Sequence, residues 1–500
     1  MCQLNASPLT HPRHLCHWYK WRFFAIIPFI RKKGYFWKME KESRRGSFTG
    51  QLGFVLAAAG SAVGVGNIWR FPYLAAKDGG GLFLIVYLIL VLTFGFTLLT
   101  SDIATGRKTG KSAIGAYTEM NPKWKFLGVL TFFVPVIIMT YYAVIGGWIT
   151  KYMVDYFTGH GKAAAADGYF SAFISNPVES VIYAAFFMVL TAVVIYRGVE
   201  KGIESCSRFM MPVLLVLIVF VAVYSLFIHH GDRNGLQGFL VYFTPNVKGL
   251  TLNKFLSLLL DAMSQLFFSL SVSMGIMITY GSYVKKEVDL NRAVSQIEIF
   301  DTGVALLAGM AIIPSIYVFS GLDGMNAGPG LMFISLPKVF ASMGFFGNIV
   351  GAAFFLMAVF ATLTSCISVL EAITANCMEV FHSERHKTTL VLGIIYTIAS
   401  IVIALGYSIF YCEIPLPNGT VGQLLDLMDY ISNSVMMPFI SLLSTILIGW
   451  IVRPKWIIGE VETGGVRFHR KQLYIVMVRF VCPVIMVVLF LQSTGLLSKL

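Results

Sequence analysis

Residues 50 to 76 bring together small residues and polar residues in a pattern that could bind ions. Gly60, Gly64 and Gly66 lie within seven residues of one another, and a continuous helix facing lipid would suffer from the low helix propensity of glycine. Asn67 and Arg70 follow directly. If this segment crosses a membrane, both side chains are costly unless they face a cavity, so they indicate a transport pathway. Close helix packing is the alternative, because Gly60 and Gly64 form a G-x-x-x-G pair.

A second segment, residues 254 to 283, has a similar interruption at its centre. Ser269, Ser271, Ser273 and Gly275 follow one another at every second position. A helix that breaks in mid-membrane exposes carbonyl groups at one half-helix end and N–H groups at the other, which suit a cation and a carboxylate respectively. The two interruptions lie in matching places of two five-helix halves, which predicts an inverted repeat with a site for a zwitterion and sodium where they meet.

The composition requires lipid as the main solvent of these segments. Of 500 residues, 57% are hydrophobic and 13% are charged, which leaves too little polar surface for a water-soluble domain. Apolar stretches near the bilayer-crossing length of roughly 20 residues must be helical, because lipid offers backbone groups no partner. We predict eleven: residues 50–76, 81–104, 126–154, 177–196, 208–228, 254–283, 293–319, 346–380, 388–408, 421–450 and 472–493.

The charges predict the orientation of the chain. Lys and Arg collect in alternate connections, which places these loops and the N-terminus in the cytoplasm of a multi-pass cell-membrane protein, with the C-terminus outside. The net charge of +13 therefore faces anionic headgroups rather than nucleic acid. The seven cysteines have no zinc or disulfide spacing, and the chain carries no nucleophile elbow, HExxH, phosphate loop or cofactor fingerprint. These observations argue against an enzyme.

The first 38 residues differ from the rest of the chain. Their apolar run, residues 23–30, is too short to cross a membrane and no cleavage site follows it. His11, His14, Cys16 and His17 could be metal ligands, yet Met39 opens an ordinary cytoplasmic start. We expect residues 1–38 to be a non-native or disordered leader and translation to begin at Met39. Peptides from residues 4–20 in the native protein would contradict this.

Several motifs resemble the neurotransmitter/sodium symporter family. They are GSAVGVGNIWRFPYLAAKDGGG from Gly60, D-x-x-x-G-R at Asp102 to Arg107, QLFFSLS from Gln265 and ATLTSCISVLE from Ala361. The resemblance covers residues 45 to about 493 and includes a bacterial eleven-helix subgroup of amino acid transporters. It implies an all-α membrane protein in which helices 1 and 6 are broken. The transporter domain would cover residues 39–493, with repeats over about 45–230 and about 250–450 and an extra helix at 472–493. It also implies alternating access driven by sodium.

By this resemblance two sodium ions bind beside the substrate. The first site would use the carbonyl of Ala62, the side chains of Asn67 and Asp301, and both oxygens of Ser269. The second would use the carbonyls of Gly60, Val63 and Ala361 and the hydroxyls of Thr364 and Ser365. Such oxygen ligands suit a hard cation. Back-bonding of the two hydroxyls to their own helix is the alternative.

The resemblance also implies a small amino acid as substrate. The N–H groups near Val65 and Gly66 and the hydroxyl of Tyr142 would hold its carboxylate, although Tyr142 could instead be a packing residue. Carbonyls of Ala62, Phe268 and Ser271 would accept from its ammonium. Gly64 stands where monoamine carriers have Asp, so the ligand must supply its own carboxylate. The uncharged pocket predicts a neutral, apolar side chain; its lining would be Val65, Ile138, Phe268, Met274, Val369 and Ser365.

Gates are expected on both sides of the site. Outside, Arg70 would pair with Asp429, with Gln265 bridging them and Tyr142 and Phe268 closing beneath. Inside, Arg45 would pair with Glu379 near Phe48 and Tyr283. Each charge could instead form a static structural pair, which is the preferred interpretation for Glu371.

Asp301 replaces an Asn found in other relatives, and no Lys or Arg lies within residues 293–319. A buried carboxylate needs a cation, so bound sodium is its expected partner. Because Ala305 replaces a chloride-binding Ser, we predict transport that does not depend on chloride. Two alternatives stay open: a proton-coupled carrier of the same fold in which Asp301 titrates, and a ligand-binding receptor or channel without coupled transport. The preferred amino acid, the operating sodium stoichiometry, proton antiport and the oligomeric state stay open as well.

Overall fold

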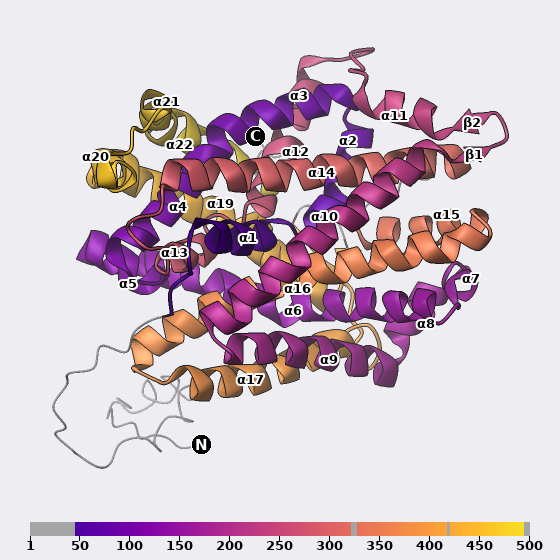
Figure 1. The fold of residues 1–500 in the computed structure, drawn as a ribbon, viewed down its shortest axis with the longest axis horizontal. Helices are drawn as coiled ribbons and strands as arrows, with labels where there is room; N and C mark the ends of the chain where they lie inside the picture. Colours follow the sequence, from indigo (N-terminus) through magenta and orange to yellow (C-terminus); the bar gives the residue numbers. More distant parts are fainter. Residues whose placement is uncertain (1–45, 322–327, 418–420, 495–500) are drawn as a thin grey trace, which may run out of the picture. The chain divides into compact units, whose positions relative to one another are not determined.

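The computed structural model describes residues 46–321, 328–417 and 421–494. This part of the chain is almost entirely helical, with two short antiparallel hairpins (Figure 1). The predicted leader 1–38 and the gate residue Arg45 lie outside the described residues. The hairpins are β1 (His229–His230) with β2 (Arg233–Asn234), and β3 (Ile414–Pro415) with β4 (Val421–Gly422).

The long helices follow the predicted spans closely. The ends of an apolar run long enough to cross a bilayer indicate where the helix begins and ends. Several contain a short π-helical turn, in which the backbone hydrogen bonds join residues five apart. Their bounds in chain order are α1 (Gln51–Ala62), η2 (Gly66–Arg70), α2 (Phe71–Lys77), α3 (Gly81–Leu90), η3 (Val91–Gly95), α4 (Phe96–Thr109), α6 (Lys125–Phe157), α9 (Pro177–Tyr196), η5 (Val199–Glu204), α10 (Ser205–Leu226), α12 (Leu252–Ser269), α13 (Ile276–Gly281), α14 (Leu290–Ser320), α16 (Phe345–Phe381), α17 (Arg385–Leu405), α18 (Leu424–Asp429), η8 (Tyr430–Met436), α19 (Met437–Ile446), η9 (Leu447–Ile451), α21 (Lys471–Val476), η11 (Met477–Val481) and α22 (Cys482–Ser493).

Shorter helices connect these spans. They are α5 (Ala113–Met120), η4 (Pro122–Trp124), α7 (Gly161–Ala164), α8 (Tyr169–Ser175), α11 (Gly235–Phe243), η7 (Leu331–Ser335), α15 (Leu336–Ser342), α20 (Lys455–Val461) and η10 (Thr463–Gly465).

By length and composition, nine helices of the described chain could cross a membrane, or ten when the bent pair Gln51–Ala62 and Gly66–Lys77 counts as one span. The predicted span 254–283 corresponds to α12 and α13, which are separated by the non-helical residues 270–275. The expected interruptions of the first and sixth spans are therefore present, and the total of eleven crossings stays a prediction.

Helices that would correspond in two five-helix repeats pack against each other. The third span, α6, packs on the eighth, α16, and the fourth, α9, packs on the ninth, α17. Figure 1 shows these four helices side by side, with α10 crossing α14 elsewhere in the bundle. The short helix α1 contacts both α14 and α16, so the broken first span packs against two spans of the second repeat.

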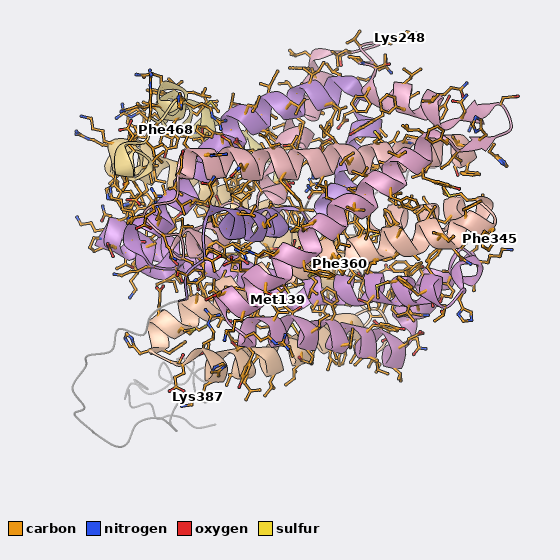
Figure 2. The ribbon with its side chains drawn as sticks, viewed as in Figure 1. Met139, Lys248, Phe345, Phe360, Lys387 and Phe468 are labelled. Carbon is orange, nitrogen blue, oxygen red and sulfur yellow. The ribbon has the colours of Figure 1, made fainter. Side chains whose placement is uncertain are left out.

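The outer surface of the bundle is apolar along the helices, which suits contact with lipid. Phe345 is 82% exposed and Val216 is 68% exposed; Figure 2 shows Phe345 at the start of α16 and Lys387 in the first turn of α17. Charged groups also form pairs, since Arg107 and Glu460 are buried together and the exposed Lys286 joins them. Arg107 Nε lies 2.7 Å from Glu460 Oε1, and Lys286 Nζ lies 2.7 Å from the same oxygen.

Candidate functional site

The break in the first span depends on glycine at two positions. The helix turns by 57° between Ala62 and Gly66. A Cβ on Gly64 would lie 2.9 Å from Tyr142 Oη and 3.0 Å from Ser365 Oγ, and a Cβ on Gly66 would lie 2.6 Å from the Phe268 ring. Side chains from three other helices thus approach bare backbone here, which explains the glycines better than packing between two helices alone.

The break in the sixth span is held by an unusual backbone and by a distant carboxylate. Ser271 (φ 52°), Ser273 (φ 61°) and Gly275 (φ 75°) all lie in the left-handed region, which residues other than glycine adopt only where the surrounding structure holds them. The N–H of Ser273 donates to Asp102 Oδ2 at 2.8 Å. Asp102, 4% exposed, therefore satisfies a backbone group that the interrupted helix leaves open.

Asp301, on α14, joins the two breaks. Its carboxylate accepts from Asn67 Nδ2 at 2.8 Å and from the Ser269 hydroxyl at 2.9 Å. Asp301 and Asn67 are fully buried and Ser269 is 1% exposed. Both of these hydrogen-bond partners are neutral, and within the described residues no Lys, Arg or His forms an ion pair with this carboxylate.

A buried carboxylate without a cationic partner is costly. The oxygens gathered here, from a carboxylate, an amide and a hydroxyl, fit a hard cation. The described residues contain no group of three or more His, Cys, Asp or Glu side chains that could hold another metal. These side chains are among the groups predicted to hold the first sodium ion.

The residues predicted for a second ion site also come together. A Cβ on Gly60 would lie 3.2 Å from Thr364 Cβ, so α1 and α16 are in close contact there. The Ser365 hydroxyl donates to the carbonyl of Val63 at 3.3 Å. The Thr364 hydroxyl donates to Phe360 O at 2.9 Å and to Ala361 O at 3.1 Å, the back-bonding considered as the alternative, and this leaves its lone pairs available to a cation.

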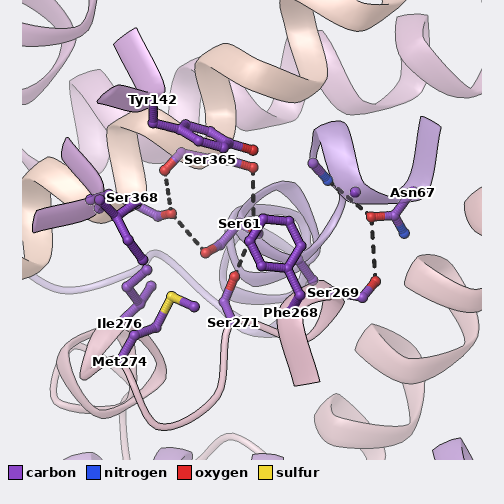
Figure 3. Close-up of a pocket in the computed structure, with 15 residues that line it drawn as sticks. Ser61, Asn67, Tyr142, Phe268, Ser269, Ser271, Met274, Ile276, Ser365 and Ser368 are labelled. Carbon is purple, nitrogen blue, oxygen red and sulfur yellow. Dashed lines mark hydrogen bonds between the residues drawn. The ribbon is translucent and has the colours of Figure 1, made fainter. Parts of the chain in front are cut away.

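A cavity of about 30 Å³ lies between the two breaks. Figure 3 shows Tyr142 and Ser365 on one side of it and Phe268 and Ser271 on the other. Every residue predicted for the substrate pocket lines this cavity except Val65. The lining residues are Ser61, Ala62, Gly64, Gly66, Asn67, Ile138, Tyr142, Phe268, Ser269, Ser271, Met274, Ile276, Ser365, Ser368 and Val369.

Val65 takes part through its backbone. Its N–H donates to the hydroxyl of Tyr142 at 3.3 Å, so the two groups predicted to hold a carboxylate lie together at the break. A ligand carboxylate at this point would meet an N–H donor and an O–H donor. Tyr142 is 5% exposed, and this contact gives it a polar partner at the break in addition to its packing.

Three cavity residues were not predicted: Ser61, Ser368 and Ile276. The Ser61 hydroxyl donates to Ser368 Oγ at 2.7 Å, and the Ser271 hydroxyl donates to the Ser61 carbonyl at 2.9 Å. The first bond joins the broken first span to α16, and the second joins the broken sixth span to the first, beside the cavity. The spacing of Ser368 three residues after Ser365, on one helix face, was the available signal.

The outer gate differs from the expected pairing. Arg70 donates to the Ser264 hydroxyl at 2.7 Å, and Asp429 accepts from Tyr141 at 2.9 Å and from Asn433 at 2.6 Å. Within the described chain no Arg70–Asp429 ion pair is formed within 4 Å. The expected direct pair is replaced by hydrogen bonds from each partner to neutral groups.

Gln265 does not bridge this pair either. Its Nε2 donates to the Gly66 carbonyl at 3.2 Å, which again joins the sixth span to the break in the first. Its Oε1 has no hydrogen-bond partner within the described residues.

On the inner side, Glu371 forms the static pair that was expected of it. Arg385 binds its carboxylate through two bonds of 2.6 and 2.7 Å, and the Tyr283 hydroxyl donates to it at 2.6 Å. Phe48 N donates to the Tyr283 carbonyl at 3.2 Å. Glu379 accepts from the Ser112 N–H at 2.5 Å, while its expected partner Arg45 lies outside the described residues.

Comparisons with known proteins agree with this architecture. A model of the sodium:neurotransmitter symporter family matches residues 45–166 and 174–499. An uncharacterized sodium-dependent transporter of Bacillus subtilis, YhdH, is 32% identical over 465 residues, covering 91% of this chain and 99% of that protein. The human sodium- and chloride-dependent GABA transporter 2 is 24% identical, covering 87% of this chain and 77% of its own length.

A solved structure is similar as well. The crystal structure of MhsT in complex with L-phenylalanine superposes with a TM-score of 0.78 at 34% identity, covering 90% of this chain and 100% of that one. The family match extends over far more than half of the chain, and the members of this family are transporters rather than enzymes. The chain therefore belongs to the sodium:neurotransmitter symporter family, a family of sodium-dependent multi-pass membrane transporters.

Proposed function

We propose that this protein carries a neutral, apolar amino acid into the cell together with sodium, by alternating access and without chloride. The observation that carries the proposal is the fully buried Asp301 carboxylate, hydrogen-bonded to neutral partners, at the junction of two broken helices. Sodium would neutralise this charge. Because Asp301 itself supplies the negative charge and Ala305 offers no hydroxyl, chloride has no role in balancing the ion.

Two sodium ions would travel with each substrate. The first would bind among Asn67, Ser269 and Asp301, and the second among the carbonyls of the first break and the hydroxyls of Thr364 and Ser365. Two ions crossing with a zwitterion move two charges, worth about 4.6 kcal/mol at roughly 100 mV. A sodium gradient of roughly tenfold adds about 2.8 kcal/mol. The sum would support accumulation by roughly five orders of magnitude at the thermodynamic limit.

The cavity supports an amino acid over an amine. Gly64 provides no carboxylate for an amine, whereas the Val65 N–H and the Tyr142 hydroxyl suit a ligand carboxylate. The remaining lining is apolar or hydroxylated, with Ile138, Met274, Ile276 and Val369 around the side-chain space. L-phenylalanine bound to the similar protein MhsT supports the same substrate class.

Radiolabelled amino acid uptake into proteoliposomes tests this function. We expect accumulation when sodium is high outside, and no accumulation with equal sodium on both sides at zero membrane potential. Accumulation driven by an imposed proton gradient in sodium-free buffer would instead identify a proton-coupled carrier. Ligand binding without uptake under any gradient would identify a receptor.

A further inference from the structure

An apolar groove of about 450 Å³ runs between α9 and α17, away from the cavity at the helix breaks. Its walls are exposed apolar side chains, among them Val193 (46% exposed) and Ile394 (55% exposed). Its floor is formed by small residues, since a Cβ on Gly393 would lie 3.3 Å from Ala192 Cβ. The volume falls within the range of about 300–1,000 Å³ typical of ligand pockets.

One end of the groove is polar and positively charged. Arg197 lines it and is exposed, and its guanidinium forms no ion pair or hydrogen bond within the described residues. Tyr196 and His386 meet at this end, with ring centroids 4.3 Å apart, so the end of α9 lies against the start of α17. The positive charge of these connections predicts that this end faces the cytoplasm.

Thr389 lies on the groove lining near the same end. It is 1% exposed, and its hydroxyl has no hydrogen-bond partner within the described residues. The accessible surface of the groove thus combines long apolar walls with the Arg197 cation at one end.

We propose that this groove is a binding site for an anionic phospholipid of the inner leaflet. The acyl chain would lie along the apolar walls, and the phosphate would pair with the guanidinium of Arg197. A second copy of the chain is a weaker fit, because the residues that line this face include no Asp or Glu that could pair with Arg197 of a partner. The site is separate from the ion and substrate sites, so it does not depend on the proposed transport.

Native mass spectrometry of the full chain in detergent tests the proposal, with phosphatidylglycerol and phosphatidylcholine of identical acyl chains as probes. We expect preferential retention of phosphatidylglycerol. Arg197→Gln should lower that retention by about fivefold. This is the change in affinity expected when one basic residue that faces anionic lipid is removed. Arg292→Gln, an exposed arginine outside the groove, is the matched control and should retain lipid as the wild type does.

The shape of the groove is tested separately. Val193→Trp should fill it and lower retention of both lipids, while Ile395→Trp, on an exposed α17 residue (52%) outside the lining, should not. Ile394→Trp replaces Val193→Trp if that variant fails to fold. Equal retention of the two lipids by the wild type, or equal loss in Arg197→Gln and Arg292→Gln, would overturn the proposal. A lipid-independent dimer that Val193→Trp dissociates would also overturn it, since the face would then be a protein interface.

Discussion

The Asp301 carboxylate accepts a hydrogen bond from the Asn67 side chain at 2.8 Å, although 234 residues separate them in the chain. This bond joins α14 to the first residues after the break in the first span. The Ser269 hydroxyl, at the end of α12, donates to the same carboxylate. One buried charge therefore contacts both broken helices, and an ion bound there would act on both.

We expect the two hydroxyls of the second ion site to raise the affinity for sodium. We expect Ser365→Ala to raise the sodium concentration for half-maximal uptake by about tenfold, because one coordinating hydroxyl near Val63 O is lost. A tenfold change corresponds to about 1.4 kcal/mol of sodium-binding free energy. Thr364→Val should act in the same direction. Sodium titrations of uptake measure this. Thr374→Val, a back-bonded buried threonine on the same helix, is the control, and an equal effect there would argue against a site at Thr364.

The charge at Asp301 predicts that chloride is dispensable. We expect the same rate and extent of uptake when gluconate replaces chloride on both sides of the membrane, because the carboxylate already balances a bound cation. Uptake that collapses in gluconate would show that an anion site exists despite Ala305.

We expect Asp102 to stabilise the interrupted sixth span. Asp102→Ala leaves the Ser273 N–H without an acceptor, so we expect a loss of about 1–3 kcal/mol in stability. Asp102→Asn keeps an acceptor oxygen and should cost less. Thermal unfolding in detergent measures both variants. Equal melting temperatures for Asp102→Ala and the wild type would show that water or another group satisfies Ser273.

Asp78 predicts a pH dependence of stability. Burial, followed by the charge of Asp261, raises the pKa of the Asp78 carboxyl from 3.8 to about 6; Lys77 Nζ lies 2.7 Å from Asp261 and 3.9 Å from Asp78. Because the folded state favours the protonated form, this contribution is complete below about pH 4 and is lost as the pH rises through about 6.

The melting temperature should therefore fall between about pH 4 and about pH 6 in the wild type. Asp78→Asn should reduce this fall and raise the melting temperature at neutral pH. Asp232→Asn, an exposed carboxylate, should leave the pH profile unchanged. Parallel profiles for the wild type and Asp78→Asn would contradict the assignment.

The sequence predicted the two broken helices because their residues are unusual for lipid-facing helices, whereas most of the cavity residues were implied by the resemblance to the symporter family. Gly64 and Gly66 lack side chains where other helices approach, and Asn67 is polar at membrane depth, so composition alone marks the break. Ser269, Ser271 and Ser273 mark the other one. These signals are local and can be recognised in a single sequence.

The missed features depend on long-range geometry. Ser273 and Asp102 are 171 residues apart, and nothing in either segment specifies that contact. The Arg70 guanidinium donates to the Ser264 hydroxyl on α12, a contact that charge pairing alone does not predict. Ser61 and Ser368 looked like ordinary small residues of packed helices, since serine commonly satisfies itself within its own helix.

Sodium coupling at Asp301 can be measured without transport, by equilibrium binding of a radiolabelled apolar amino acid to purified protein in sodium and in choline at equal ionic strength. We predict that affinity falls by more than about tenfold in choline, which corresponds to a coupling free energy within the range of about 1–3 kcal/mol, and that Asp301→Ala reduces this difference because only the second sodium site remains. Equal affinity in sodium and choline for the wild type, or an unchanged sodium dependence in Asp301→Ala, would contradict the proposed coupling.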